Sequence, residues 1–246
     1  MQRAVLMGRI AGRSLKRAEH VAREILADVV ERELPPGTPL PPEAVMLKEY
    51  EVSRGTFREA LRILEVHGLI TIKPGPSGGP RIAAVTAREF ARTATFYYRA
   101  MGATFGDLVQ TRLVVEPMMA RLAARNCTAA DATGFEDNLA MAKVAAPKES
   151  LRLAFEFHEM IGRICGNQVL AMFDRSMGEI FDMYSLNSLP ERENELHLRA
   201  HGNIARAIID GDQDRAEASM RKHLEGIVRD FEQRNGDIVD QVVDWL

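Results

Sequence analysis

The side chains best suited to chemistry in this sequence are arginines at the start of one predicted helix. Apolar residues recur there at i, i+3, i+4 and i+7 from Phe57, so the opposite face, with Arg58 and Arg62, is expected to point to solvent. Ser53 is a strong N-cap residue, because its hydroxyl can accept from a free backbone N–H of the first turn. Guanidinium groups bind guanine edges or phosphates. Arginines in the first turns therefore suit a recognition helix that enters the major groove of DNA.

Short predicted elements flank this helix on both sides. Residues 39–43 are rich in proline and expected to be extended, because residues before proline avoid the helical region. His67 and Gly68 end the helix, and residues 74–80 make a flexible tip of glycine and proline. The pattern predicts a helix over residues 44–50, a helix from residue 53, and strands over residues 69–72 and 81–85. With one helix before them, these elements form a winged helix-turn-helix.

The first third of the chain resembles the DNA-binding domain of GntR-superfamily transcription regulators. The resemblance is carried by segments 40–43 (Leu-Pro-Pro-Glu), 52–61 (Val-Ser-Arg-Gly-Thr-Phe-Arg-Glu-Ala-Leu) and 68–70 (Gly-Leu-Ile). It implies that a wing tip near Gly75 reaches the minor groove and that five further residues contact operator DNA: Ser53, Arg54, Gly55, Thr56 and Arg58. Some members have a DNA-contacting arginine where this chain has Ala44, which implies a somewhat different operator. The alternative for the arginines is an ordinary solvated helix face.

Length and composition fit a two-part globular protein. The 246 residues accommodate one or two domains, and 46% apolar and 27% charged residues are average values. We find no apolar run long enough for a membrane span and no secretory leader, so the cytoplasm is expected. Cys127 and Cys165 lie in apolar, helical contexts, which favours packed thiols over a disulfide or a nucleophile.

Charge is divided unevenly along the chain. Residues 1–92 carry 15 Lys and Arg against 11 Asp and Glu, whereas the remaining residues carry 17 against 24. A basic head on an acidic body agrees with a protein that holds DNA at one end only. The excess is modest and would not indicate DNA binding by itself.

The rest of the chain is expected to be helical almost throughout. Turn and capping residues such as Thr128 and Asp212 separate the segments, and no alternating β-branched runs intervene. The predicted fold class is mainly α, with a winged helix-turn-helix over residues 1–86 and an all-α antiparallel helical bundle over residues 87–236. Residues 237–246 are expected to form a C-terminal tail or a short helix. The predicted helices of the bundle cover residues 87–99, 104–126, 129–142, 149–165, 168–185, 191–209 and 213–233.

These helices resemble the FCD effector domain of the FadR-type subfamily. The matching segments are 112–117 (Arg-Leu-Val-Val-Glu-Pro), 157–161 (Phe-His-Glu-Met-Ile) and the stretch from residue 201 to 224. Members of this subfamily bind small carboxylate effectors in the helical core, at or beside a divalent metal held by one Asp and three His. The resemblance implies an effector site of Arg112, Glu116, His158, His201 and His223, with the three histidines also as metal ligands.

The predicted metal site departs from the family pattern at one ligand. The Asp would lie one turn before His158, where this chain has Ala154, and Glu156 lies roughly on the far side of that helix. Three histidines can still hold an ion of the Zn or Ni type, with water or effector oxygens in the open positions. A metal-free pocket whose imidazoles bond the ligand is the alternative. His197, four residues before His201, has a spacing that permits it to join the site.

Two interpretations of Arg112 and Glu116 are open. They are one helical turn apart, so a surface ion pair that contributes a few tenths of a kcal/mol is the simplest. The resemblance implies instead that Arg112 faces the effector, where its planar fork suits a carboxylate.

Three classes of function can be weighed. An effector-controlled transcription regulator, expected to be a repressor, would act as a homodimer on a palindromic operator, because each copy reads one half-site. A metal-dependent enzyme using the three histidines lacks a matched general base, a metalloprotease motif and a phosphate loop. A constitutive DNA-binding protein with a structural helical domain would bind DNA whatever small molecule is present. The regulator is favoured, and neither enzyme activity nor membrane association is expected.

Overall fold

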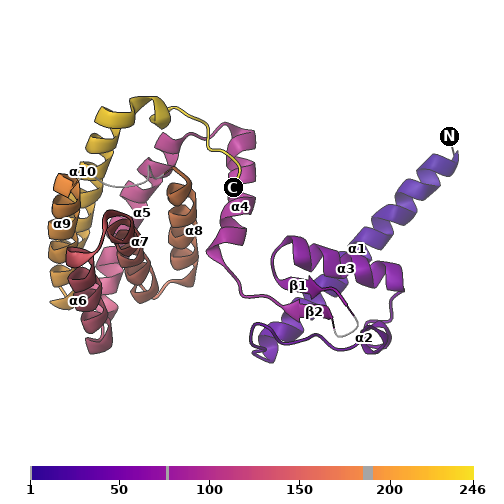
Figure 1. Ribbon diagram of the computed structural model, residues 1–246. Coiled ribbons are helices and arrows are strands. Elements are labelled where there is room, and N and C mark those ends of the chain that lie inside the picture. The colour runs from indigo at the N-terminus through magenta and orange to yellow at the C-terminus, as the bar shows by residue number, and fades with distance from the viewer. Residues whose placement is uncertain (1, 76–77, 185–190) are drawn as a thin grey trace. The chain divides into compact units, whose positions relative to one another are not determined.

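The computed structural model describes residues 2–75, 78–184 and 191–246, and the chain divides after residue 89 into two compact units (Figure 1). The N-terminal unit contains α1 (Gln2–Glu31), α2 (Glu43–Glu49), α3 (Arg54–Val66), β1 (Ile70–Lys73) and β2 (Gly79–Ile82). The two strands form an antiparallel hairpin. Three helices followed by a hairpin are the winged helix-turn-helix that the sequence predicts.

The helix α3 begins where its capping residue predicts. The backbone N–H of Thr56 donates to Ser53 Oγ at 3.2 Å, so Ser53 is the N-cap. The apolar stripe that starts at Phe57 is buried against α1, α2 and the hairpin. Burial of this stripe fixes the rotation of α3 and leaves Arg54 and Arg58 exposed.

The second strand of the hairpin begins earlier than the sequence predicts. It covers residues 79–82 rather than 81–85, with Ile82 opposite Ile70. The segment after α1 also pairs with this strand. The N–H of Ile82 donates to the carbonyl of Thr38 at 2.9 Å, and the N–H of Leu40 donates to the carbonyl of Pro80 at 2.9 Å. These hydrogen bonds hold β2 on the side away from β1, a long-range effect that local residue preferences do not reveal.

The C-terminal unit is built from helices, as predicted. They are α4 (Ala87–Met101), α5 (Phe105–Asn126), α6 (Ala129–Val144), α7 (Pro147–Ile164), α8 (Gln168–Tyr184), α9 (Glu191–Ile209) and α10 (Gln213–Val239). Thr104 and Thr128 each form a capping box with the Asp three residues later. Asp212 accepts from the backbone N–H of Arg215 at 3.1 Å at the start of α10. The predicted end of one helix at residue 185 lies outside the described residues.

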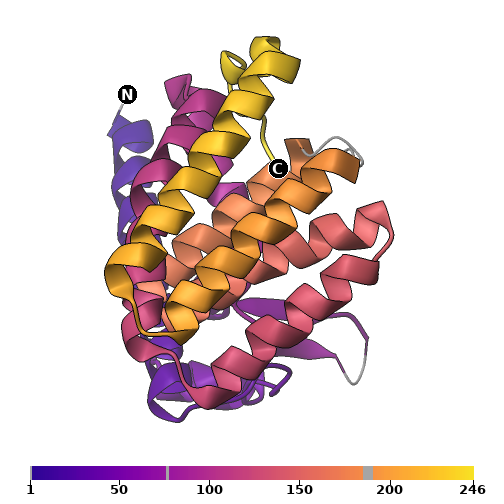
Figure 2. The same ribbon diagram turned by 90° about the vertical axis from the view of Figure 1, so that its left-hand side faces the viewer.

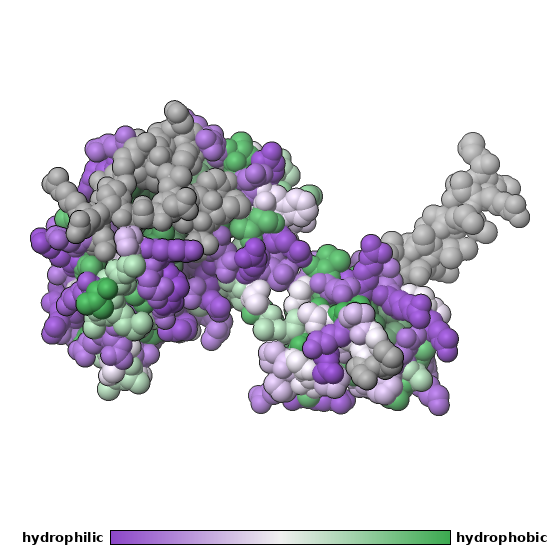
Figure 3. Space-filling model, in the orientation of Figure 1, coloured by the Kyte–Doolittle hydropathy of each residue, from purple (hydrophilic) through white to green (hydrophobic). Residues whose placement is uncertain are grey.

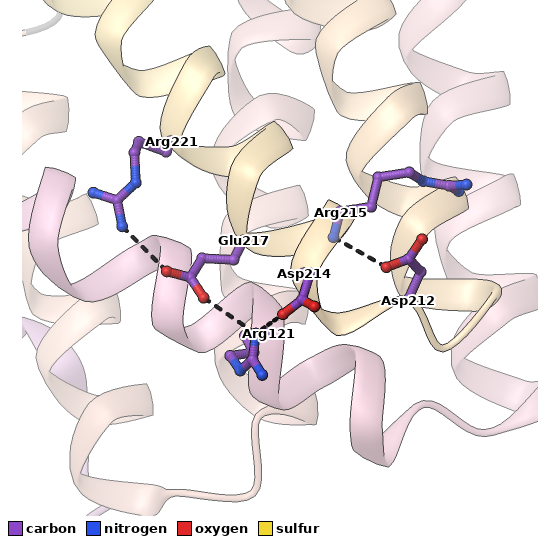
Figure 4. Close-up of polar contacts among 6 residues, drawn as sticks. All are labelled: Arg121, Asp212, Asp214, Arg215, Glu217 and Arg221. Carbon is purple, nitrogen blue, oxygen red and sulfur yellow. Dashed lines mark hydrogen bonds and ion pairs between the residues drawn. The ribbon is translucent and has the colours of Figure 1, made fainter.

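The core of the helical unit lies between α5, α7, α9 and α10. Its fully buried side chains include Met119, Phe157, Ile161, Ile204 and Ile208. The helix α5 packs along α10 (Figure 1). Polar contacts at the edge of this packing join Arg121 of α5 to Asp214 and Glu217 of α10 (Figure 4). Cys127 and Cys165 are free thiols, as expected from the sequence.

Residues 240–246 form a packed tail and not a further helix. The N–H of Val243 donates to the carbonyl of Ala103 at 2.9 Å, and that of Leu246 donates to Thr95 Oγ1 at 3.3 Å. The Val243 side chain is fully buried. An extended tail lets Val243 enter the space beside α4 and α5 while its backbone bonds to their junction.

Hydrophilic residues cover much of the face drawn in Figure 3, and apolar residues show as separate patches among them. None of the described helices is both long enough and apolar enough to cross a membrane. The buried apolar residues form clusters within each of the two units.

Candidate functional site

The solvent-facing side of α3 collects the residues expected to contact DNA. Ser53, Arg54, Gly55 and Arg58 are exposed, and Thr56 is partly buried. Ser53 Oγ lies 3.0 Å from Thr56 Oγ1, so both hydroxyls belong to the capping arrangement. The nearest carboxylate to Arg58 is that of Glu43 at 4.0 Å, and the Arg58 side chain is 73% exposed. This surface offers guanidinium groups that are free to bind an external partner.

The tip of the hairpin needs glycine for its backbone. Gly75 has φ of +104°, a conformation that favours glycine, and its carbonyl accepts from the N–H of Gly78 at 2.9 Å. A Cβ at Gly78 would lie 2.2 Å from the carbonyl oxygen of Lys73, so no larger residue fits there. These two glycines permit the close backbone approach at residues 75 and 78.

Three histidines from three helices converge in the core of the helical unit. His158 lies on α7, His201 on α9 and His223 on α10, and one nitrogen from each lies within 4.8 Å of the others. The Nε2 atoms of His201 and His223 are 3.1 Å apart. The ring of Phe157 stacks on His201 with a centroid distance of 4.2 Å, which helps to fix its orientation. Packing of the three helices therefore brings together residues that are up to 65 positions apart.

The environment keeps two of these imidazoles neutral. Burial lowers the pKa of His201 and of His223 well below the usual value, and the neighbouring histidines lower it further. A neutral imidazole has a free electron pair on one ring nitrogen and can bind a metal ion without first losing a proton. The cluster can therefore supply nitrogen ligands to a metal cation.

A buried carboxylate holds the third histidine. The Oε2 atom of Glu116 lies 2.6 Å from Nδ1 of His158, and Glu116 also accepts a hydrogen bond from Arg112 Nε. Burial by itself would raise the pKa of Glu116, but Arg112 and His158 outweigh it, so the pKa is lowered and the group is ionised. The Arg112 guanidinium also lies 4.7 Å from the centre of the Phe181 ring. Because the side chains of Arg112 and Glu116 are only 13% and 3% exposed, this is a buried pair and not a surface one.

The residues present fit a bound divalent ion. With Nδ1 of His158 bonded to Glu116, its Nε2 is left for a ligand, and metal-binding histidines commonly donate their other N–H to a carboxylate. Ala154 brings no oxygen to this point, and Glu156 is at the surface beside Arg152, with 3.0 Å between the charged atoms. The ring of His197 lies 5.4 Å from that of His223 between centroids, outside the group of three.

An open cavity of about 900 Å³ reaches this cluster from the side of α5, α7 and α8. Arg112, His158 and Asp174 are among its lining residues. Asp174 is 7% exposed, and its pKa is raised well above the usual value by burial and by Glu116, against the opposing effect of Arg112. Sequence reasoning missed this residue. Its spacing from the buried Met177 and Ile180, three and six positions later, was a signal that it lies on an apolar helix face.

Comparison with known proteins identifies both units. Residues 17–77 match the bacterial regulatory proteins of the gntR family, and residues 107–226 match the FCD domain. The HTH-type transcriptional repressor RspR of Escherichia coli is 28% identical over 234 residues, which are 89% of this chain and 92% of that protein. The repressor NanR of Salmonella schwarzengrund is 27% identical over 238 residues, 88% of each chain. The solved structure of Streptococcus agalactiae GntR has the same fold, with a TM-score of 0.70 and 23% identity over 87% of this chain and 99% of that one.

Proposed function

Because this chain belongs to the GntR family of bacterial regulatory proteins and carries an FCD domain, we infer that it is a transcription repressor whose operator binding is controlled by a small carboxylate. It is a DNA-binding regulator and not an enzyme, in agreement with the named repressors that it resembles along most of its length. Its place of action would be the cytoplasm, where the operator DNA is.

The N-terminal unit would supply the contacts with DNA. The exposed face of α3 offers Arg54 and Arg58 for base edges and phosphates, with Gly55 and Thr56 close to the groove. Gly75 in the wing tip would approach the minor groove. One copy of this unit covers only a half-site, so we propose a homodimer on a palindromic operator.

The helical unit would supply the effector site. The observation that carries this proposal is the buried series of contacts from Arg112 through Glu116 to His158, at the wall of the 900 Å³ cavity. Maintaining charged groups in a core is costly unless they are paired, and their retention beside a cavity suits ligand binding. Arg112 would attract the effector carboxylate. Glu116 would orient His158.

His158, His201 and His223 would hold a divalent ion of the Zn or Ni type. When bound, such an ion accepts electron pairs from effector oxygens and leaves positions open for them, because the protein provides three nitrogen ligands. A metal-free pocket with the same histidines as hydrogen-bonding groups is the alternative. Metal content of chelator-free protein, compared with His158→Ala and His223→Ala, separates the two: about one ion per chain that both variants lose supports the metal site, and no ion in any preparation contradicts it.

Control by a carboxylate is tested on operator DNA. Duplexes selected from a random pool on the purified protein provide an operator, and fluorescence anisotropy then measures its affinity with each of a panel of small carboxylates. At least one carboxylate should change the affinity of the natural protein for its operator about five-fold or more, a typical coupling between two sites. The same carboxylate should leave the operator affinity of Arg112→Gln unchanged. Affinity that no carboxylate changes would favour the constitutive DNA-binding alternative.

A further inference from the structure

A second groove, of about 750 Å³, lies between α9 and α10, which are side by side (Figure 2). Its volume is within the range of small-molecule sites. Its lining contains no Asp or Glu among the described residues. It does contain five cationic residues: Arg199 and Arg206 on α9, and Arg215, Lys222 and Arg229 on α10. A groove with one sign of charge concentrates counter-ions from solution.

The spacing of these residues places them in two rows. Successive members are seven positions apart on each helix, and seven residues make almost two complete turns. Each row therefore keeps to one face of its helix and repeats about every 10 Å. The two rows form opposite walls, so an anion between the helices can be held from both sides.

Part of this charge is available to a ligand. Arg215 lies 2.7 Å from the Asp210 carboxylate, and Arg199 lies 3.6 Å from that of Glu195. No described carboxylate lies within 4.0 Å of the other three cations, Arg206, Lys222 and Arg229.

Two acidic residues near the start of α10 face another helix. Asp214 and Glu217 contact Arg121 of α5, and Glu217 also binds Arg221 at 3.2 Å (Figure 4). The start of α10 therefore has a face whose carboxylates are paired with arginines and a second, basic face at the groove. This segregation keeps carboxylates out of the groove lining.

Small residues leave room between the two rows. Ala200, Ser219 and Gly226 line the groove, and a Cβ added at Gly226 would meet no atom within 4 Å. Asn203 and Ser219 add neutral hydrogen-bonding groups. His223 also lines the groove, so the groove extends inward as far as a residue of the histidine cluster.

The cavity beside Arg112 has a different charge pattern. Its lining combines basic residues with five acidic ones, namely Glu149, Glu156, Glu159, Asp174 and Glu179. An anion with several charges meets nearby carboxylates there and meets none in the described lining of the groove. Electrostatics therefore favour the groove for the more highly charged anions.

We propose that the groove between α9 and α10 is a second ligand site, which binds a compact oxyanion with at least two negative charges. Arg206 and Lys222 grip the oxyanion from opposite walls. Arginine forms paired hydrogen bonds with carboxylate or phosphate oxygens, and lysine contributes a point charge. The lining of this groove shares no residue with that of the cavity of Arg112, although it reaches His223. The protein would therefore bind an anionic metabolite in addition to its effector.

Titration calorimetry of the full chain, stripped of metal and at low ionic strength, tests this proposal. Pyrophosphate represents oxyanions that contain phosphate, and propane-1,2,3-tricarboxylate represents polycarboxylates. Acetate is the singly charged control. At least one multivalent probe should bind at one per chain, and acetate should not. Lys222→Gln and Arg206→Gln should each weaken binding about ten-fold, as expected when one charged partner is lost. Lys143→Gln, a matched change at an exposed position of α6, should leave it unchanged.

The variant Arg112→Gln distinguishes the two proposed sites. Binding of the multivalent probe should persist in this variant, whether or not the effector proposal is correct. The groove proposal is overturned if neither probe binds, or if Lys222→Gln and Arg206→Gln bind as tightly as the natural protein. It is likewise overturned if binding is lost in an Arg112→Gln variant whose circular dichroism is unchanged. It is also overturned if Lys222→Gln weakens the binding of duplex DNA but does not weaken the binding of the small anions. Circular dichroism of each variant verifies that the helices are intact.

Discussion

The Nδ1 atom of His158 lies 2.6 Å from Oε2 of Glu116, inside the helical unit and 42 positions away in sequence. This contact joins the histidine cluster to Arg112, because Glu116 binds both. A single carboxylate thus orients a candidate metal ligand and neutralises a buried guanidinium. Several consequences of this arrangement can be measured.

We expect Glu116→Gln to weaken metal binding without abolishing it. The variant keeps an oxygen near His158 but removes the negative charge that makes the imidazole a stronger metal ligand. Loss of such a partner typically costs about 10–100-fold in metal affinity. Competition with a chelating dye measures the change. Glu136→Gln is the matched control, since Glu136 lies at an exposed position of α6, outside the lining of the cavity. Equal losses in both variants would contradict an orienting role for Glu116.

Replacement of Arg112 by Met should destabilise the helical unit strongly. It leaves the ionised Glu116 buried with only His158 as a partner, and breaking a buried pair from one side costs about 3–5 kcal/mol. Urea unfolding, followed by the circular dichroism of the helices, provides the free energy of unfolding. Changing Glu116 to Leu in the same chain should restore part of the loss, because the carboxylate that lost its partner is then absent. A double variant as unstable as the single one would show that packing of Arg112, not its charge, is what matters.

Asp174→Asn should stabilise the ligand-free protein at neutral pH. Its pKa in the folded state is raised above the unfolded value near 3.8, so the ionised carboxyl disfavours folding. This penalty is absent below the unfolded pKa, grows as pH rises above it, and is complete above the folded-state pKa. The groups that act on Asp174 are Arg112 and Glu116 from α5 and Glu159 from α7. Thermal unfolding of both proteins from pH 4 to 8 should show the advantage of the variant increasing with pH; an advantage independent of pH would indicate a packing effect instead.

Arg58→Ala should weaken operator binding while α3 remains folded. The Arg58 side chain is exposed and makes only a long contact with Glu43, so its removal has little effect on stability. A bidentate contact with a base contributes ~1–3 kcal/mol, which corresponds to roughly 5- to 150-fold in affinity. Fluorescence anisotropy at several salt concentrations measures this change. Arg125→Ala, the same substitution at an exposed position of α5, is the control and should bind as the natural protein does.

Ser53 has two expected roles, as the N-cap of α3 and as a contact with DNA, and two substitutions separate them. Ser53→Ala removes the cap on Thr56 and should cost ~1 kcal/mol in stability of the N-terminal unit. Ser53→Asp retains a capping oxygen, so the stability should be largely kept, whereas its charge should repel DNA phosphates. Comparison of urea unfolding with operator affinity separates the outcomes. If Ser53→Asp binds operator as well as the natural protein, Ser53 does not lie close to the DNA backbone.

The sequence by itself determined those features that depend on neighbouring residues. Ser53 and Thr128 cap their helices because the bonded N–H groups lie three positions away. The rotation of α3 follows from the apolar stripe that begins at Phe57, since burial of that stripe must expose Arg58. The mainly helical fold and the winged helix-turn-helix were predictable on the same local grounds, together with the family resemblance.

Only the tertiary structure decided which charges are buried and what they contact. Arg112 and Glu116 have the spacing of an ordinary surface pair, but packing of α5 against α7 and α8 buries them and brings Glu116 to His158. Asp174 and the cationic rows of α9 and α10 acquire their surroundings in the same way. The energy of a charge depends on its distance from other charges and from water, and in this fold those distances are set by helices far apart in sequence.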